Sequence, residues 1–159
     1  MPAFIHQLAR SPGGVPKLPV PEAMIRFTGL EGDWQSNRKY HGGPDRAICL
    51  FANEMVEALQ NHGHPIQAGS VGENVTTVGL QWSRVEPGVR LQLGATVVLE
   101  IVSYTVPCRT IRGAFSDGDF TRIAQTLNPG ASRVYARVLT EGMVRVGDEI
   151  AVLPEARDD

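Results

Sequence analysis

The chain has 159 residues, a length typical of one domain and sufficient to bury a core without disulfide bonds. Its 42% hydrophobic and 20% charged residues are ordinary values for a globular protein. The formal net charge of −2 argues against a general basic field for binding nucleic acid, and no apolar run reaches the roughly 18 residues of a membrane span.

The sequence gives no sign of subdivision or of export. We find no repeat, linker or low-complexity tract, and we expect a single domain over residues 1–159. Two cysteines, Cys49 and Cys108, are too few for a disulfide framework and suit a reducing compartment. The first ten residues lack the apolar core of a secretory signal, so we expect a cytoplasmic protein without membrane attachment.

Short β-strands dominate the elements predicted in chain order. The segment 11–23 carries four prolines and two glycines and must be extended or turning. The runs with strand character cover residues 3–9, 23–29, 46–51, 73–79, 89–93, 96–106, 133–140 and 149–153, and several alternate apolar and polar residues, as 133–138 does.

Two helices are predicted among these strands. Residues 53–63 have Asn53 as a cap and Gly63 as a terminator, and residues 119–130 have Asp119 as a cap. Because the strands do not alternate with helices, we expect a mainly β fold with a few short helices, an α+β fold built on a closed or nearly closed β-barrel.

Cys108 is the first candidate for chemistry. It follows a long apolar strand and a proline, and it precedes a short predicted helix or turn that contains Arg109 and Arg112. The start of a helix and two cations all favour a thiolate, the form that attacks electrophiles or binds metals. A small buried side chain is the other interpretation of Cys108, and for Cys49, which has apolar neighbours on both sides, core packing is favoured.

Two loops add further candidates. His41 and Arg46 bracket a loop that contains Gly42 and Gly43, directly ahead of the apolar run 47–51. Glu73 and Asn74 follow a loop in which Gly69 and Gly72 permit a positive φ or a close backbone approach.

The ordered set Gly-Asp, His-Gly-Gly-x-x-Arg-Ala, Gly-Glu-Asn and Pro-Cys resembles the MOSC domain, the family named after the C-terminal part of molybdenum-cofactor sulfurase. The four motifs stand at residues 32–33, 41–47, 72–74 and 107–108. The likeness extends over about residues 4–153, and the early segment 11–20 is similar to the family's N-terminal element. It implies a β-barrel with a shallow site for a molybdenum-pterin cofactor (molybdopterin).

The resemblance also assigns residues. Cys108 occupies the position of the cysteine that ligates molybdenum in the reducing members, which agrees with the affinity of soft thiolates for such metals. His41, Arg46, Glu73 and Asn74 would surround the cofactor. The chemistry of the side chains suggests a role for each residue. Arg46 would bind the cofactor phosphate, and His41 would hydrogen-bond the pterin or move a proton. Gly42 and Gly43 would let backbone amides approach an anion, and Lys17 and Arg109 are weaker candidates for binding the phosphate. Arg46 paired only with Asp45 or Asp33, and His41 as a turn cap, are the alternatives.

The leading functional hypothesis is a molybdenum-dependent reductase of N-hydroxylated small molecules, such as hydroxylamines or amidoximes, with Cys108 and His41 as catalytic residues. Because the chain has no flavin or nicotinamide signature, a separate protein would donate the electrons. Pyridoxal phosphate is not expected, and a second subunit, as in a homodimer, is one way to cover the site. The alternative is a sulfur carrier that holds a persulfide on Cys108 and receives sulfur from a donor. A Cys108–His41 hydrolase and a zinc site at His62 and His64 are weaker hypotheses.

Overall fold

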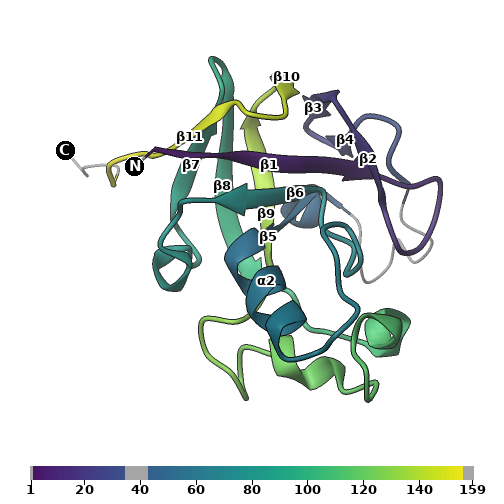
Figure 1. Cartoon of the computed structure of the whole chain (residues 1–159). Helices are drawn as coiled ribbons and strands as arrows, with labels where there is room; N and C mark the ends of the chain where they lie inside the picture. The colour runs from purple at the N-terminus through teal and green to yellow at the C-terminus, as the bar shows by residue number, and fades with distance from the viewer. Residues whose placement is uncertain (1, 35–42, 156–159) are drawn as a thin grey trace.

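A computed structural model describes residues 2–34 and 43–155 of the chain (Figure 1). Eleven strands make up most of its described elements: β1 (Ala3–Arg10), β2 (Leu18–Val20), β3 (Glu22–Arg26), β4 (Gly29–Leu30), β5 (Ile48–Ala52), β6 (Val75–Val78), β7 (Arg90–Leu93), β8 (Val97–Tyr104), β9 (Val134–Thr140), β10 (Gly142–Arg145) and β11 (Glu149–Val152). One α-helix, α2 (Asn53–Asn61), is joined by four 3₁₀ helices within the described residues: η1 (Pro44–Arg46), η2 (Trp82–Arg84), η3 (Arg109–Ala114) and η4 (Phe120–Ile123).

Seven of these strands close into a barrel. The order is β11–β7–β8–β9–β5–β6–β1, and β1 pairs with β11 to complete the ring, while β2 extends the sheet beyond β1. All neighbouring pairs are antiparallel except β5 and β6, which are joined through α2. The mainly β, barrel-based fold class predicted from the sequence is therefore confirmed.

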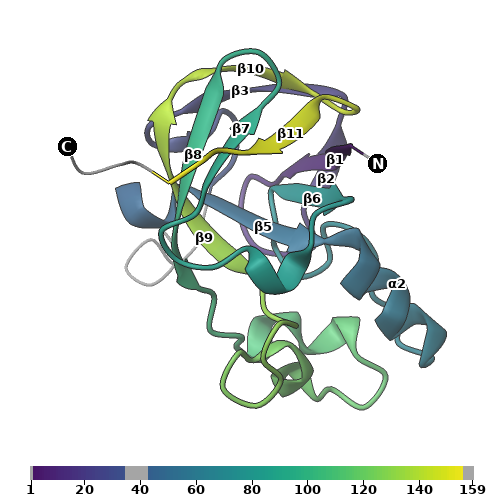
Figure 2. The same ribbon diagram turned by 90° about the vertical axis from the view of Figure 1, so that its left-hand side faces the viewer.

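The barrel interior is filled by alternating apolar side chains. On β9 the side chains of Val134, Ala136 and Val138 are buried, and Arg137 is exposed, as the period-two pattern predicts. The small sheet β10–β3–β4 covers one end of the barrel, and the segment between β8 and β9 forms a lobe of 3₁₀ helices and loops at the opposite end (Figures 1 and 2). The site lies where this lobe meets the barrel.

Three expectations for local structure need correction. The helix predicted over 119–130 is only the 3₁₀ helix η4, although Asp119 does cap it by accepting a hydrogen bond from the Thr121 amide at 3.1 Å. At α2 the N-cap is Ala52 rather than Asn53, whereas Gly63 ends the helix with a φ of +87°. No strand is predicted between residues 140 and 149, but this region contains β10, which pairs with β3.

Candidate functional site

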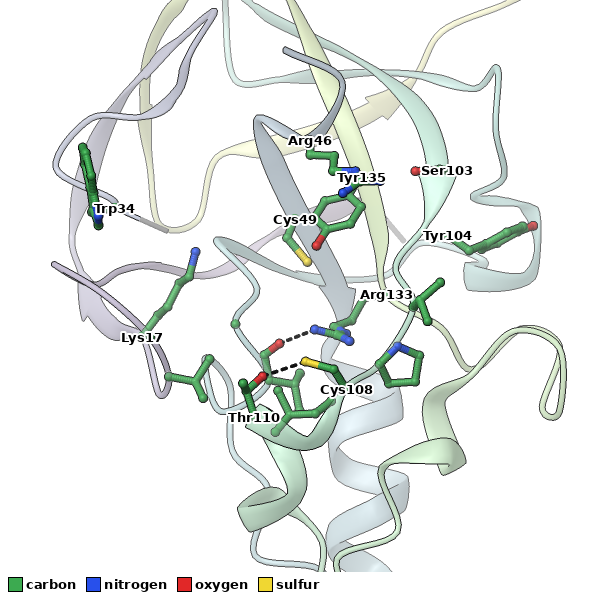
Figure 3. A pocket seen from close by; sticks show the side chains of 17 residues that line it. Lys17, Trp34, Arg46, Cys49, Ser103, Tyr104, Cys108, Thr110, Arg133 and Tyr135 are labelled. Atoms are coloured by element: carbon green, nitrogen blue, oxygen red, sulfur yellow. Dashed lines mark hydrogen bonds between the residues drawn. The ribbon is translucent and has the colours of Figure 1, made fainter. Parts of the chain in front are cut away.

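A cavity of about 690 Å³ lies at the junction of the barrel and the lobe (Figure 3). Its lining comes from segments far apart in the sequence, including β5, β8, β9, η1, η3 and the loops before β2 and β6. The lining combines apolar surface with polar side chains, and its residues are Gly14, Val15, Lys17, Trp34, Arg46, Cys49, Val71, Gly72, Ser103, Tyr104, Val106, Pro107, Cys108, Thr110, Ile111, Arg133 and Tyr135.

Cys108 lies at this cavity and is partly exposed. Its backbone is extended, with φ −138° and ψ 173°, and it is the N-cap residue of η3, as the sequence predicts. Its Sγ lies 2.8 Å from the hydroxyl oxygen of Thr110, which also lines the cavity. Thr110 therefore fixes the direction of a sulfur that a ligand in the cavity is able to reach.

Arg46 lies on another wall of the same cavity. It ends η1, and its guanidinium carbon is 5.7 Å from the ring centre of Tyr135, a cation–π contact that orients the side chain. The acids proposed as its alternative partners have other partners, because Asp33 pairs with Lys17 at 2.7 Å and Asp45 approaches Arg137 at 3.6 Å.

Lys17 also lines the cavity, but its charge is balanced. Its ammonium group and the carboxylate of Asp33 form an ion pair whose side chains are only 6% and 5% exposed. The same carboxylate accepts hydrogen bonds from the side-chain amide of Asn74 at 3.0 Å and from the backbone of Ser11 at 2.9 Å. The Gly-Asp and Gly-Glu-Asn motifs thus meet in one buried polar network.

Asn74 connects this network to the barrel. Its side-chain oxygen accepts a hydrogen bond from the Cys49 backbone amide of β5 at 3.1 Å. Its side-chain amide group also donates a hydrogen bond to the Ala9 carbonyl oxygen of β1 at 3.3 Å. Asn74 is fully buried and does not line the cavity, so its observed contacts support the wall from behind.

Glu73 is likewise fully buried behind the wall. One carboxylate oxygen accepts a hydrogen bond from Thr76 at 3.2 Å, and the other has no partner. Burial raises the pKa of Glu73, with opposing contributions from backbone amides and from the nearby charge of Arg133. The preceding loop depends on Gly69, which has a φ of +89° and whose added Cβ would lie 2.5 Å from the Lys17 carbonyl oxygen.

Four predicted site residues remain to be placed. His41 and Gly42 lie outside the described residues. Gly43, with a φ of +95°, is exposed at the start of η1, and Arg109 is exposed on η3; neither belongs to the cavity lining. Anion binding by Gly43 and Arg109 therefore receives no support from their positions.

Cys49, Tyr135 and Arg133 are among the cavity-lining residues that the sequence analysis did not propose for the site. Cys49 lies opposite Tyr135 across β5 and β9, and Tyr135 lies opposite Ser103 across β9 and β8, so these three side chains form a row on one face of the sheet. Arg133 and Tyr135 were visible as the polar side of an alternating strand. A polar side that faces a cavity has the same pattern as one that faces solvent.

Burial governs the ionisation of this row. It raises the pKa of the Cys49 thiol and of the Tyr135 hydroxyl, which favours the neutral forms of both. The Cys49 sulfur lies 3.9 Å from the hydroxyl oxygen of Thr105. Both groups therefore line the cavity in surroundings that disfavour their charged forms.

The histidines proposed as zinc ligands have other contacts. The Nδ1 atom of His62 lies 2.9 Å from the Ala58 carbonyl oxygen, and Nδ1 of His64 accepts a hydrogen bond from the Ser116 amide at 3.1 Å. Residues 2–34 and 43–155 contain no group of three or more His, Cys, Asp or Glu side chains arranged to hold a metal ion. In the same residues no helix is long and apolar enough to cross a membrane.

Solved structures share this fold. The crystal structure of YiiM from Geobacillus stearothermophilus matches with a TM-score of 0.71 at 23% identity, over 96% of this chain and 76% of that one. The crystal structure of YiiM from Escherichia coli matches with a TM-score of 0.68 at 25% identity, over 99% of this chain and 72% of that one.

Two curated proteins are similar to this chain in sequence, and one of them is again a YiiM protein. Protein YiiM of Escherichia coli K12 is 28% identical over 152 residues, which are 92% of this chain and 66% of YiiM. The uncharacterized protein YflK of Bacillus subtilis 168 is 30% identical over 143 residues, 88% of this chain and 63% of YflK. The chain thus spans slightly less than two thirds of the length of either curated relative.

A protein-family model also matches most of the chain. The model of the MOSC domain matches residues 37–151, a range that includes β5 to β9 and contains three of the four quoted motifs. Since this match covers more than half of the sequence, the chain belongs to the MOSC domain family.

Proposed function

We propose that the cavity binds a molybdenum-pterin cofactor and that the protein reduces N-hydroxylated small molecules, of the hydroxylamine or amidoxime type. The observation that carries the proposal is the meeting of a partly exposed thiol, Cys108, with the cations Arg46 and Lys17 around one open cavity. A volume of about 690 Å³ is within the usual range of roughly 300–1,000 Å³ for small-molecule sites.

The donor set fits such a cofactor. A pterin dithiolene brings its own sulfur ligands, so one protein thiolate is sufficient, and the described residues offer no metal cage of their own. Cys108 would hold the metal, and Arg46 would bind the cofactor phosphate through a planar guanidinium. When bound, the cofactor would supply two-electron redox chemistry, with electrons from a separate donor protein.

The protein's own groups would orient the reactants. Thr110 would hold the direction of the Cys108 sulfur, and Tyr135 would present a neutral hydroxyl at the cavity wall. His41 remains our candidate for moving a proton, since an imidazole changes charge near neutral pH.

Molybdenum content tests the proposal. The full chain, Cys108→Ser and the matched control Cys49→Ser are expressed in a host that makes molybdopterin, and molybdenum per chain is measured. We expect the metal in the unsubstituted chain and in Cys49→Ser, with at least about tenfold less in Cys108→Ser, because one strong ligand is lost. After chemical reduction of its bound cofactor, the molybdenum-loaded chain should also reduce an amidoxime such as benzamidoxime. A chain without molybdenum from that host would contradict the proposal.

The partly exposed sulfur of Cys108 also favours a second function, a sulfur carrier that holds a persulfide. Mass spectrometry of the same preparations separates the two functions. A stable addition of one sulfur atom at Cys108, in a chain without molybdenum, would support the carrier. A free thiol together with bound molybdenum would exclude it.

A further inference from the structure

Arg133 is a buried cation at the cavity whose hydrogen-bonding capacity is mostly unused. It precedes β9, is 6% exposed, and lines the cavity near Cys108 (Figure 3). Its Nη1 donates to the Val71 carbonyl oxygen at 2.6 Å, whereas its Nε is buried and has no partner. A guanidinium carries five N–H groups, so a single bond to the protein leaves donors for a ligand.

Within the described part of the chain, no acid forms an ion pair with Arg133. The ion pairs among residues 2–34 and 43–155 include Lys17 with Asp33 but none with Arg133. Glu73 is the acid that interacts with it, and burial favours the protonated form of Glu73. Because buried charges in proteins are normally paired, the unpaired guanidinium points to an anion that comes from outside the chain.

The surroundings of Arg133 limit the shape of that anion. Apolar side chains of Val71, Val106 and Ile111 line the same cavity, together with Tyr135. A ligand that satisfies this wall carries one planar oxyanion on a mainly apolar body, since a guanidinium binds a carboxylate through two parallel hydrogen bonds.

We propose that Arg133 binds a carboxylate of the substrate, so that the cavity selects N-hydroxylated molecules with an apolar body and one anionic group. This inference rests on the proposed function in taking the cavity as the substrate site. It assigns the cofactor phosphate to Arg46 at η1 and the substrate anion to Arg133 at β9. Arg133 is thus a specificity-determining residue for the proposed reaction.

Binding of benzoate and of its neutral analogue benzamide tests the inference without any redox activity. Calorimetric titrations use the full chain, both free of cofactor and loaded with it, and compare Arg133→Met with the control Arg109→Met, whose arginine is exposed outside the cavity. We expect the unsubstituted chain and Arg109→Met to bind benzoate at least about tenfold more tightly than benzamide, because a charge-assisted hydrogen bond distinguishes the two ligands. Arg133→Met should lose this preference while its thermal unfolding stays cooperative.

The other possible results of these titrations also decide whether Arg133 binds the substrate anion. Equal affinities for benzoate and benzamide in the unsubstituted chain would overturn the inference, and this comparison needs no variant to fold. A loss of inorganic phosphate binding in cofactor-free Arg133→Met, or a loss of molybdenum from Arg133→Met, would assign Arg133 to the cofactor and also overturn the inference. A benzoate preference in a chain that never acquires molybdenum would leave the anion site standing while the reductase fails.

Discussion

The two polar clusters around the cavity differ in how far the protein satisfies them. The first contains Lys17, Asp33 and Asn74, whose charges are paired and whose side chains are hydrogen-bonded to one another and to β5. The second contains Arg133 and Glu73, each of which has a buried polar atom without a partner. Both clusters are buried, so burial alone does not distinguish a structural group from a ligand-binding one. At Arg133 the unsatisfied hydrogen-bonding capacity coincides with a position in the cavity lining, and this combination points to a ligand.

The largest effect is expected when the first cluster loses its charge balance. Asp33→Asn would leave the ammonium group of Lys17 buried without a counter-charge, and we expect unfolding to become easier by about 3–5 kcal/mol. Urea denaturation measures the change. The matched control is Glu31→Gln in the exposed pair with Arg26, which should cost less than about 1 kcal/mol. Similar losses for the two variants would mean that the first cluster is not a structural unit.

A smaller loss is expected for Asn74→Ala. The substitution removes hydrogen bonds to Cys49, Ala9 and Asp33 and leaves buried backbone groups unsatisfied, at a cost of about 1–3 kcal/mol. Asn53→Ala, at a partly exposed residue whose side-chain amide donates a hydrogen bond to Glu57, should change stability by less than about 0.5 kcal/mol. Equal effects in urea denaturation would contradict the role of Asn74 as a connection between β1 and β5.

The second cluster should make stability depend on pH. The pKa of Glu73 is higher in the folded chain than its ordinary value of 4.5, so the folded state binds this proton more tightly. The stability that results is present below pH 4.5 and is lost as the pH rises through the folded pKa. Glu73→Gln removes this dependence. Its unfolding free energy relative to the unsubstituted chain should therefore increase between about pH 5 and pH 7.5 in urea titrations. A constant difference would show that Glu73 is not destabilised by burial.

The smallest effect is expected for Arg133→Met. The substitution loses one hydrogen bond to Val71 but also removes an unbalanced buried charge, so the net change should stay within about 1 kcal/mol. Lys17→Met is the sharper comparison, because it strands the carboxylate of Asp33 and should cost about 3–5 kcal/mol. If both variants lose the same stability, Arg133 is as structural as Lys17, and the contrast between the clusters disappears.

The strands were predictable because their side chains alternate. On β9 the apolar residues Val134, Ala136 and Val138 mark one face, and that face is buried. The helix expected over 119–130 failed for a local reason. Asp119 caps η4 as predicted, by accepting a hydrogen bond from the Thr121 amide. The chain then leaves the helical conformation at Ala124, whose ψ is 126°. Phe120 and Ile123 already reach the hydrophobic core from the short 3₁₀ turn, so burying them does not require a longer helix.

The site was predictable only in part, because motifs identify residues but not the direction of their side chains. Cys108 and Arg46 line the cavity, whereas Glu73 and Asn74 from an equally distinct motif lie behind its wall. Arg133 could not be singled out from the sequence, since nothing local to it reveals that β9 turns this side toward a cavity. Tertiary pairing of β9 with β5 and β8 decides that question.

The pairing of β1 with β11 has a consequence for the order of the chain. Ala3 lies opposite Ile150 and Phe4 opposite Glu149, so β1 and β11 are neighbours in the closed barrel. The ring of strands therefore does not require the chain to begin at β1. A circularly permuted chain, with a short linker from residue 152 to residue 3 and new ends in the exposed turn 86–88, would preserve every strand neighbour of the ring. Such a permutant would allow a redox protein to be tethered at a new point of the surface without altering the cavity.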